Sequence, residues 1–310
     1  MESPPRLRVS VLVNASAGTM ARLRATNLEE QLLSAFDEAG ITATFEVLPS
    51  PHLRAAAERA LQKVREGTLD AVMAGGGDGS IRTIAGVLAG TGVPLAILPL
   101  GTRNHFARDL GIPLDSREAV AVLANGELRD VDVGAMNGEV FLNNSSIGLY
   151  PLLVLERERQ RRRKHLPKWL AMLFAAARVP RYWPLFTLTV RMEGVAEACR
   201  TPLLFVGNNE YRLALPAAGR RERLDGAELS VYVARSENRL AFFWLACRAI
   251  FGLSRAADMR IVKGKTADIE TRRHRLLVSF DGEVELVHPP LHYEIRPGAL
   301  RVFAPPAPET

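Results

Sequence analysis

A glycine-rich segment is the part of this sequence best suited to hold a phosphate group. The apolar run 71–74 leads directly into Gly-Gly-Gly-Asp-Gly-Ser at 75–80, and a helical pattern follows over 81–88. Glycines let the backbone approach a phosphate closely, and the first N–H groups of a helix favour an anion. The segment lacks the Gly-Lys-Ser/Thr of a Walker loop and the glycine spacing of a dinucleotide fold. Phosphate binding is therefore predicted for Gly76, Gly77, Asp78, Gly79 and Ser80, and the alternative interpretation is a tight structural turn.

Two other polar loops follow predicted strands in the same half of the chain. The segment 98–108 comes after the strand 94–98, and the segment 14–18 comes after the strand 7–13. Ligands of open parallel sheets bind at the carboxyl ends of the strands. Three loops at one sheet edge favour a binding site over a purely structural role. We expect Asn14, Thr102 and Asn104 to line that binding site.

Acidic turns in the second half are candidates for acid–base and metal chemistry. Asp281 and Glu283 flank Gly282, and a carboxylate that is partly shielded from water is suited to accept a proton from a hydroxyl group. Asp225 precedes Gly226 in a similar turn. Taken alone, each Asp-Gly pair is more typical of a plain turn.

The elements that position these residues change character near residue 130. Strand and helix signals alternate up to that point, which predicts an α/β domain with a parallel sheet over 6–130. Strand-like runs dominate afterwards, interrupted by helical patterns at 168–178 and 238–251, and Asn137-Gly138 reads as a hairpin turn. A mostly antiparallel second domain is expected over 131–295, with a disordered tail over 305–310.

Charge and composition indicate where the protein works and which partners it meets. The net charge is +6, and the stretch 156–168 holds seven Lys/Arg against two Glu, a local excess of five positive charges. Lys and Arg beside Trp169 favour contact with an anionic membrane surface, with a solvated helix as the alternative. The patch lacks interleaved aromatic residues, so nucleic-acid binding is not expected. The sequence has only two cysteines, and it shows neither an apolar segment long enough to span a bilayer nor a secretory signal. We therefore expect a cytoplasmic protein that associates with membranes transiently.

Taken together, the motifs resemble those of the diacylglycerol kinase catalytic family, which includes sphingosine and ceramide kinases and bacterial YegS-like lipid kinases. The family carries Asn-Pro-x-x-Gly, Gly-Gly-Asp-Gly-Thr and Pro-x-Gly-Thr-x-Asn-Asp-Phe-Ala in this order. The chain matches them at 14–18, 76–80 and 99–107, and later similarities lie at 141–148, 224–229 and 280–283. The resemblance covers nearly the full length.

That resemblance implies a phosphofructokinase-like first domain, a β-sandwich second domain and ATP in the cleft between them. It implies that a strand at 296–304 completes the first domain, that Asp281 and Glu283 are catalytic, and that Mg²⁺ binds Asp225, Glu222 and the carbonyl of Ala227. The expected activity is phosphorylation of a lipid hydroxyl, on diacylglycerol, a sphingoid base or a related lipid. An NAD kinase-like enzyme and a catalytically silent lipid-binding protein are the alternatives, and a homodimer is left open.

Several positions depart from the family pattern. His105 replaces Asp, Ser80 replaces Thr, and Leu224 replaces a frequent Asp. Arg82 and Thr83 replace the usual Asn-Glu. The Thr usually found near the end of the second strand is missing, and Ser50 is the nearest hydroxyl. These differences put metal, nucleotide and substrate preference in question.

Overall fold

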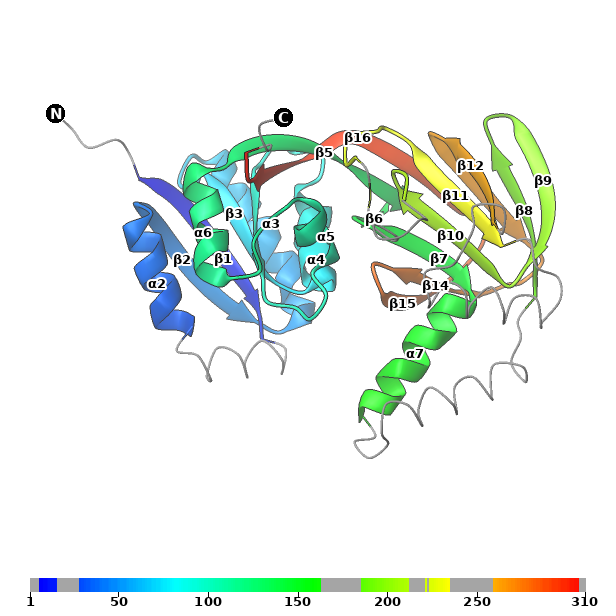
Figure 1. Ribbon diagram of the computed structural model, residues 1–310, viewed down its shortest axis with the longest axis horizontal. Coiled ribbons are helices and arrows are strands. Elements are labelled where there is room, and N and C mark those ends of the chain that lie inside the picture. The colour runs from blue at the N-terminus through cyan, green and yellow to red at the C-terminus, as the bar shows by residue number, and fades with distance from the viewer. Residues whose placement is uncertain are drawn as a thin grey trace. The chain divides into compact units, whose positions relative to one another are not determined.

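A computed structural model describes two compact units of the chain (Figure 1). One unit comprises Met1–Val133 with Pro297–Thr310, and the other comprises Gly134–Arg296. The described residues are 6–15, 28–162, 185–211, 221, 223–234 and 259–306. The helices predicted at 168–178 and 238–251, and the tail at 307–310, lie outside these ranges.

The first unit is built on a parallel sheet with the strand order β2-β1-β3-β4. Its strands are β1 (Leu7–Asn14), β2 (Ile41–Leu48), β3 (Ala71–Gly76) and β4 (Leu95–Pro99). Its helices are α2 (Leu28–Glu38), the short η1 (Ser50–His52), α3 (Leu53–Arg65), α4 (Asp78–Leu88), α5 (His105–Asp109) and α6 (Ser116–Asn125). This confirms the predicted α/β fold with a parallel sheet.

The direction of the crossovers explains how the helices cover this sheet. The chain moves outward from β1 to β2 and then back past β1 to β3. Because such crossovers are right-handed, the reversal places α2 and α3 on opposite faces. Accordingly α2 contacts α6, whereas α3 contacts α4. Strand β3 is therefore covered on both sides and is buried along its whole length.

The second unit contains mainly antiparallel strands. Six of them form a sheet in the order β12-β11-β10-β7-β14-β15. These are β12 (Met259–Gly264), β11 (Leu229–Ala234), β10 (Leu203–Asn208), β7 (Asn144–Gly148), β14 (Leu276–Phe280) and β15 (Glu283–Val287). A second layer adds β13 (Thr266–Thr271), β8 (Phe186–Met192) and β9 (Val195–Thr201), and the helix α7 (Leu149–Arg162) follows β7. The antiparallel domain is thus also confirmed.

Side chains from both layers of the second unit meet in one apolar core. Ile147, Leu204 and Val278 from the six-stranded sheet belong to the same buried cluster as Leu188 and Ile269 from the other layer. The alternating burial of β8 shows why this works, since every second residue faces the core. The two inner faces form the sandwich.

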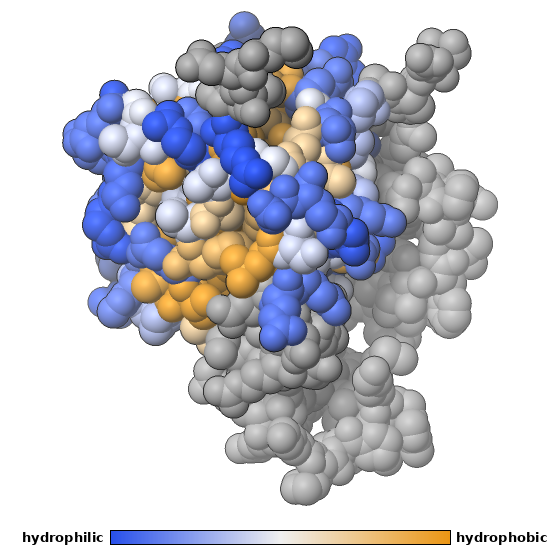
Figure 2. All heavy atoms as spheres, turned by 90° about the vertical axis from the view of Figure 1, so that its left-hand side faces the viewer, coloured by the Kyte–Doolittle hydropathy of each residue, from blue (hydrophilic) through white to orange (hydrophobic). Residues whose placement is uncertain are grey.

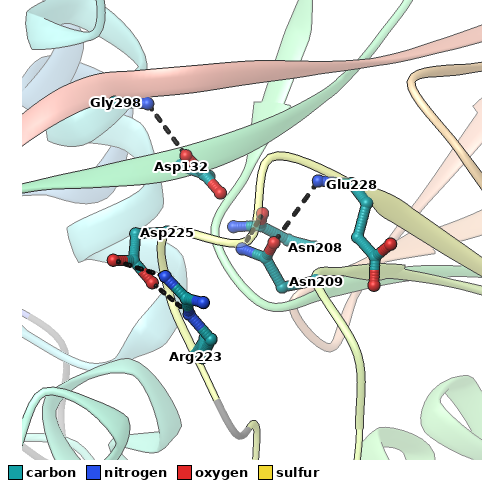
Figure 3. Close-up of polar contacts among 7 residues, drawn as sticks. All are labelled: Asp132, Asn208, Asn209, Arg223, Asp225, Glu228 and Gly298. Carbon is teal, nitrogen blue, oxygen red and sulfur yellow. Dashed lines mark hydrogen bonds and ion pairs between the residues drawn. The ribbon is translucent and has the colours of Figure 1, made fainter.

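Two long strands contribute residues to both units. They are β5 (Glu127–Met136), which continues through a hairpin into β6 (Glu139–Phe141), and β16 (Leu291–Ala304). In the first unit Val302 of β16 pairs in parallel with Leu95 of β4. The buried carboxylate of Asp132 accepts a 2.8 Å hydrogen bond from the backbone N–H of Gly298, which fixes β5 to β16 there (Figure 3).

Candidate nucleotide-binding and catalytic residues

The glycine loop begins where β3 ends and continues into the first turn of α4. Gly77 caps α4 with extended backbone, and Asp78 lies in the first helical turn. The first N–H groups of a helix have no acceptor within that helix, so they remain suited to an anion. The loop cannot accept larger side chains, since a Cβ on Gly76 would lie 2.7 Å from the hydroxyl of Ser80. The glycines therefore allow a compact turn at the edge of the sheet.

A cluster of three polar side chains lies beside this loop. Asn14, at the end of β1, donates hydrogen bonds of 2.6 Å to the hydroxyl of Ser80 and 3.0 Å to that of Ser50. The hydroxyl of Ser50 donates in turn to the Asn14 side-chain oxygen at 3.2 Å. Asn14 and Ser80 are buried, whereas Ser50 is exposed. Ser50 thus supplies a hydroxyl directly after β2, and with Asn14 and Ser80 it links three loops of the first unit.

The loop that follows β4 packs directly against the glycine loop. The carbonyl oxygen of Gly76 accepts hydrogen bonds from the backbone N–H groups of Leu100, at 3.0 Å, and Gly101, at 3.1 Å. A Cβ on Gly101 would lie 2.5 Å from the Cα of Gly77. Asp78 accepts a 3.1 Å hydrogen bond from the backbone N–H of Phe106, in the first turn of α5. The two loops therefore behave as one structural piece.

Asn104 shapes the second loop from within. Its backbone is left-handed, with φ of 52°, and its side-chain amide donates to the carbonyl oxygens of Gly101 at 3.0 Å and Pro99 at 3.3 Å. Its side-chain oxygen is buried and has no hydrogen-bond partner within the described part of the chain. Thr102, two residues earlier, is exposed. Asn104 thus fixes the loop that presents Thr102.

In the second unit, Asp281 and Gly282 form the turn between β14 and β15. Both residues have positive φ, 49° and 89°, as required by a two-residue hairpin of type I′. The Asp281 carboxylate accepts three backbone N–H groups, from Leu142 at 2.8 Å, Asn143 at 2.7 Å and Asn144 at 3.0 Å. Glu283 begins β15 and is exposed. Asp281 is therefore an anchor for the segment that enters β7.

Arg221 binds the same entering segment through other atoms. Its guanidinium donates to the Leu142 carbonyl at 2.6 Å and to the Asn143 side-chain oxygen at 3.0 Å. Asn208 also donates to the Leu142 carbonyl, at 2.8 Å. Nothing in the sequence pattern singled out Arg221 or Asn208, because Arg221 lies 79 positions from Leu142. Only the tertiary structure brings these groups together.

The proposed metal residues lie in the loop before β11. Asp225 faces Arg223, which donates two hydrogen bonds to its carboxylate at 3.0 and 3.3 Å (Figure 3). The bonded guanidinium lowers the pKa of Asp225. Gly226 packs tightly on Asn209, because a Cβ there would lie 2.7 Å from the side-chain oxygen of Asn209. Ala227 has a left-handed φ of 54°.

These residues do not form a ready-made cation site. Glu222 lies outside the described residues. Within the described ranges, no group of three His, Cys, Asp or Glu side chains is placed to hold a metal. Oxygen donors of this kind suit Mg²⁺, which takes few protein ligands and retains water. The guanidinium of Arg223 already occupies part of the Asp225 carboxylate.

The sequence of the chain is similar to sequences of known kinases. The profile of the family described as "Diacylglycerol kinase catalytic domain" matches residues 8–136. A Mycobacterium tuberculosis protein named "Diacylglycerol kinase" is 32% identical over 82% of the chain and 81% of its own length. A Pseudomonas aeruginosa protein named "Probable lipid kinase YegS-like" is 46% identical, but over only 30% of the chain and 31% of that protein.

A solved structure agrees over the full length. The structure comes from Bacillus anthracis str. Sterne and carries a diacylglycerol kinase name. It superposes with a TM-score of 0.75 at 25% identity, over 98% of this chain and 99% of the other. The similarity therefore extends well beyond the segment that holds the glycine loop.

Proposed function

Because the chain belongs to the diacylglycerol kinase family, we propose that it is an ATP-dependent lipid kinase. It transfers the γ-phosphate of ATP to a hydroxyl group of diacylglycerol, a sphingoid base or a related lipid. The observation that carries this proposal is the joined pair of loops after β3 and β4, in which Gly76, Gly101 and Asp78 make the connecting contacts. Phosphoryl transfer requires above all that phosphates be held and oriented, and such loops are suited to that task.

We assign the nucleotide contacts to the first unit. The backbone N–H groups of Gly76, Gly77, Asp78, Gly79 and Ser80 hold the phosphates of ATP. Thr102 and Asn104 contact the rest of the nucleotide, with the buried Asn104 oxygen as a free acceptor for an amino or hydroxyl group. Asn14 holds Ser80 in place through its 2.6 Å hydrogen bond.

The acceptor hydroxyl needs a base, and the geometry suggests a division of roles. Each Asp281 oxygen already accepts a backbone N–H group, and one of them accepts two. A carboxylate has about four acceptor positions, so little capacity remains on Asp281. We propose that exposed Glu283 takes the proton from the lipid hydroxyl, and that Asp281 holds the turn that carries Glu283.

Magnesium is proposed as the companion of ATP, where it would offset phosphate charge. Asp225, Glu222 and the Ala227 carbonyl are its proposed protein ligands, once Arg223 releases Asp225. The oxygen atoms of these residues are ligands that suit Mg²⁺, and Arg223 competes with the ion for the Asp225 carboxylate.

The lipid substrate implies contact with a membrane surface. No helix among the described residues is long and apolar enough to span a bilayer. The basic residues 157–168 carry the proposed contact with anionic lipid, although their side chains lie outside the described part. We therefore propose a cytoplasmic protein that docks transiently on the membrane through this basic segment. Reversing the charges of this segment should reduce co-sedimentation with anionic liposomes, and unchanged sedimentation would contradict the docking role.

The activity is tested with radiolabelled ATP and a panel of acceptors. The purified chain should transfer label to at least one of diacylglycerol, a sphingoid base or ceramide in mixed micelles. NAD is included as a soluble acceptor, and label on NAD alone would indicate an NAD kinase. Lipid binding without any transfer would indicate a catalytically silent protein. Either of these two results would overturn the proposal.

A further inference from the structure

The second unit holds an arginine side chain in its interior. Arginine side chains usually lie at the protein surface, and Figure 2 shows hydrophilic side chains spread over the face that it presents. Arg221, by contrast, is only 8% exposed. Burying a charge is costly unless hydrogen bonds compensate for the lost water. The groups that bind this guanidinium therefore indicate its role.

Arg221 and Asp281 bind the two ends of one peptide group. The carbonyl oxygen of Leu142 accepts a 2.6 Å hydrogen bond from Nη1 of Arg221. The N–H of the same peptide group belongs to Asn143, and it donates to Oδ1 of Asp281 at 2.7 Å. A trans peptide points its C=O and N–H in opposite directions, so the cation and the carboxylate act on this group from opposite sides. Hydrogen bonds in such a chain polarise and strengthen one another.

Other contacts hold this peptide group in the same place. Nη2 of Arg221 donates to the side-chain oxygen of Asn143 at 3.0 Å, which joins the guanidinium to two successive residues. Asn208 donates to the Leu142 carbonyl at 2.8 Å. Leu142, Asn143 and Asn208 are all buried. Because water has little access there, a partner that is lost is not replaced by solvent, and the orientation of the segment depends in part on Arg221.

We propose that Arg221 is a positioning residue for phosphoryl transfer, an inference that rests on the proposed kinase function. By polarising the shared peptide group, Arg221 strengthens the hydrogen bond that this group donates to Asp281. Asp281 begins the turn that leads into Glu283, so a displacement of Asp281 also displaces the proposed base. A misplacement of about 1 Å can lower a rate about 10²-fold. Arg221 thus acts on the reaction through Asp281, without touching the substrate.

The first test follows the Asn143 amide by NMR and needs no substrate. With asparagine isotopically labelled in the full chain, the amide proton of Asn143 should shift upfield in Arg221→Ala, because its hydrogen bond to Asp281 weakens. Arg221→Lys keeps the charge but not the planar pair of donors, so its shift should be smaller, and it carries the test if Arg221→Ala does not fold. Arg191→Ala is the matched control, since it removes an exposed arginine of the same unit, and it should leave the signal unchanged. An unchanged Asn143 signal in both Arg221 variants would overturn the proposal.

Kinetics separate positioning from stabilisation. With the lipid that the parent labels fastest, Arg221→Ala should lower kcat by about 10²-fold. Its KM for ATP should stay within about twofold of that of the parent, since the nucleotide contacts are assigned to the first unit. A residue that only stabilises the fold would leave kcat per folded molecule unchanged. Millimolar guanidinium ion, far below denaturing concentrations, should restore part of the kcat of Arg221→Ala but not that of Asp281→Asn.

Failure of this inference and failure of the kinase function give different results. An unchanged kcat in Arg221→Ala, or a loss no larger than in Arg191→Ala, would overturn the role of Arg221 and leave the kinase function in place. A parent that labels none of the lipids would instead refute the kinase function, and with it the role of Arg221 in transfer.

Discussion

The side chain of Asn14 donates a 2.6 Å hydrogen bond to the hydroxyl of Ser80, although the two residues are 66 positions apart. This contact joins the end of β1 to the first helical turn after the glycine loop. Both side chains are buried, so their polar atoms need partners within the protein, and Asn14 finds a second one in Ser50. Through Ser50 the same contact reaches the segment after β2. Three loops of the first unit are thus held together by three polar side chains.

Removing the hydroxyl of Ser80 should weaken ATP binding. Ser80→Ala leaves the Asn14 amide with Ser50 alone and loosens the first turn of α4. We expect the KM for ATP to rise about tenfold, which corresponds to about 1.4 kcal/mol. Asn14→Ala combined with Ser80→Ala should cost less than the sum of the single changes. Strictly additive effects in steady-state kinetics would show that the contact does not position the loop.

Gly101 should be more sensitive to a methyl group than Gly77. A Cβ on Gly101 would lie 2.5 Å from the Gly77 Cα and 2.6 Å from the Asn104 side-chain oxygen. Gly101→Ala should therefore lower the free energy of unfolding by about 1–3 kcal/mol, as overpacking does. Gly77→Ala is the matched control, since its nearest neighbour lies at 3.4 Å. Urea unfolding measures both, and equal stabilities would contradict the close packing of the two loops.

Asp281 and Glu283 should respond differently to loss of charge. Glu283→Gln removes the proposed base from an exposed position, so transfer to lipid should fall by about 10²-fold or more, with a smaller loss of stability than in Asp281→Asn. Asp281→Asn replaces an accepting oxygen with an NH₂ group that faces backbone N–H groups, so it should reduce both stability and activity. Lipid kinase assays and thermal unfolding separate the two effects. Full activity in Glu283→Gln would refute its role as base.

Arg223 should compete with Mg²⁺ for Asp225. The guanidinium holds the carboxylate through two hydrogen bonds and lowers its pKa. Arg223→Ala should therefore reduce the Mg²⁺ concentration needed for half-maximal activity, and direct titration of Mg²⁺ by calorimetry should show tighter binding. Arg223→Lys retains the positive charge but cannot form the paired hydrogen bonds. Its Mg²⁺ requirement should therefore lie between those of the parent and Arg223→Ala. Unchanged Mg²⁺ dependence in all three proteins would remove Asp225 from the metal site.

The ion pair of Arg8 with Asp70 should make part of the stability depend on acid pH. Hydrogen bonding from Arg8 lowers the pKa of Asp70. A carboxyl group whose pKa is lower in the folded state stabilises the protein above its unfolded pKa of about 4, and that stabilisation is lost as pH falls through the folded value. Asp70→Asn should therefore lower the melting temperature at pH 7 but narrow its difference from the parent at pH 3. A difference that is constant with pH would contradict this account.

The sequence by itself determined the types of element and the place of the loops. Strict alternation of apolar runs and helical periods up to residue 130 specifies parallel β/α units, because each pattern has its own repeat. The same pattern predicts that the loops after the strands 71–76 and 95–99 lie close together, since neighbouring parallel strands end at one edge of the sheet. The short helix α5 and the strands β9 and β15 were missed, because five or seven residues carry little periodic signal.

Tertiary structure alone decided which polar groups satisfy one another. Residue spacing could not predict three of these contacts. They are the hydrogen bonds of Asp281 to the residues entering β7, those of Arg221 to the same segment, and those of Arg223 to the Asp225 carboxylate. These contacts join residues with no common local pattern, or set one charge against another within a loop. Local sequence fixes backbone preferences over a few residues, whereas hydrogen-bond partners are chosen only when the folded chain brings distant groups within 3 Å or so of each other.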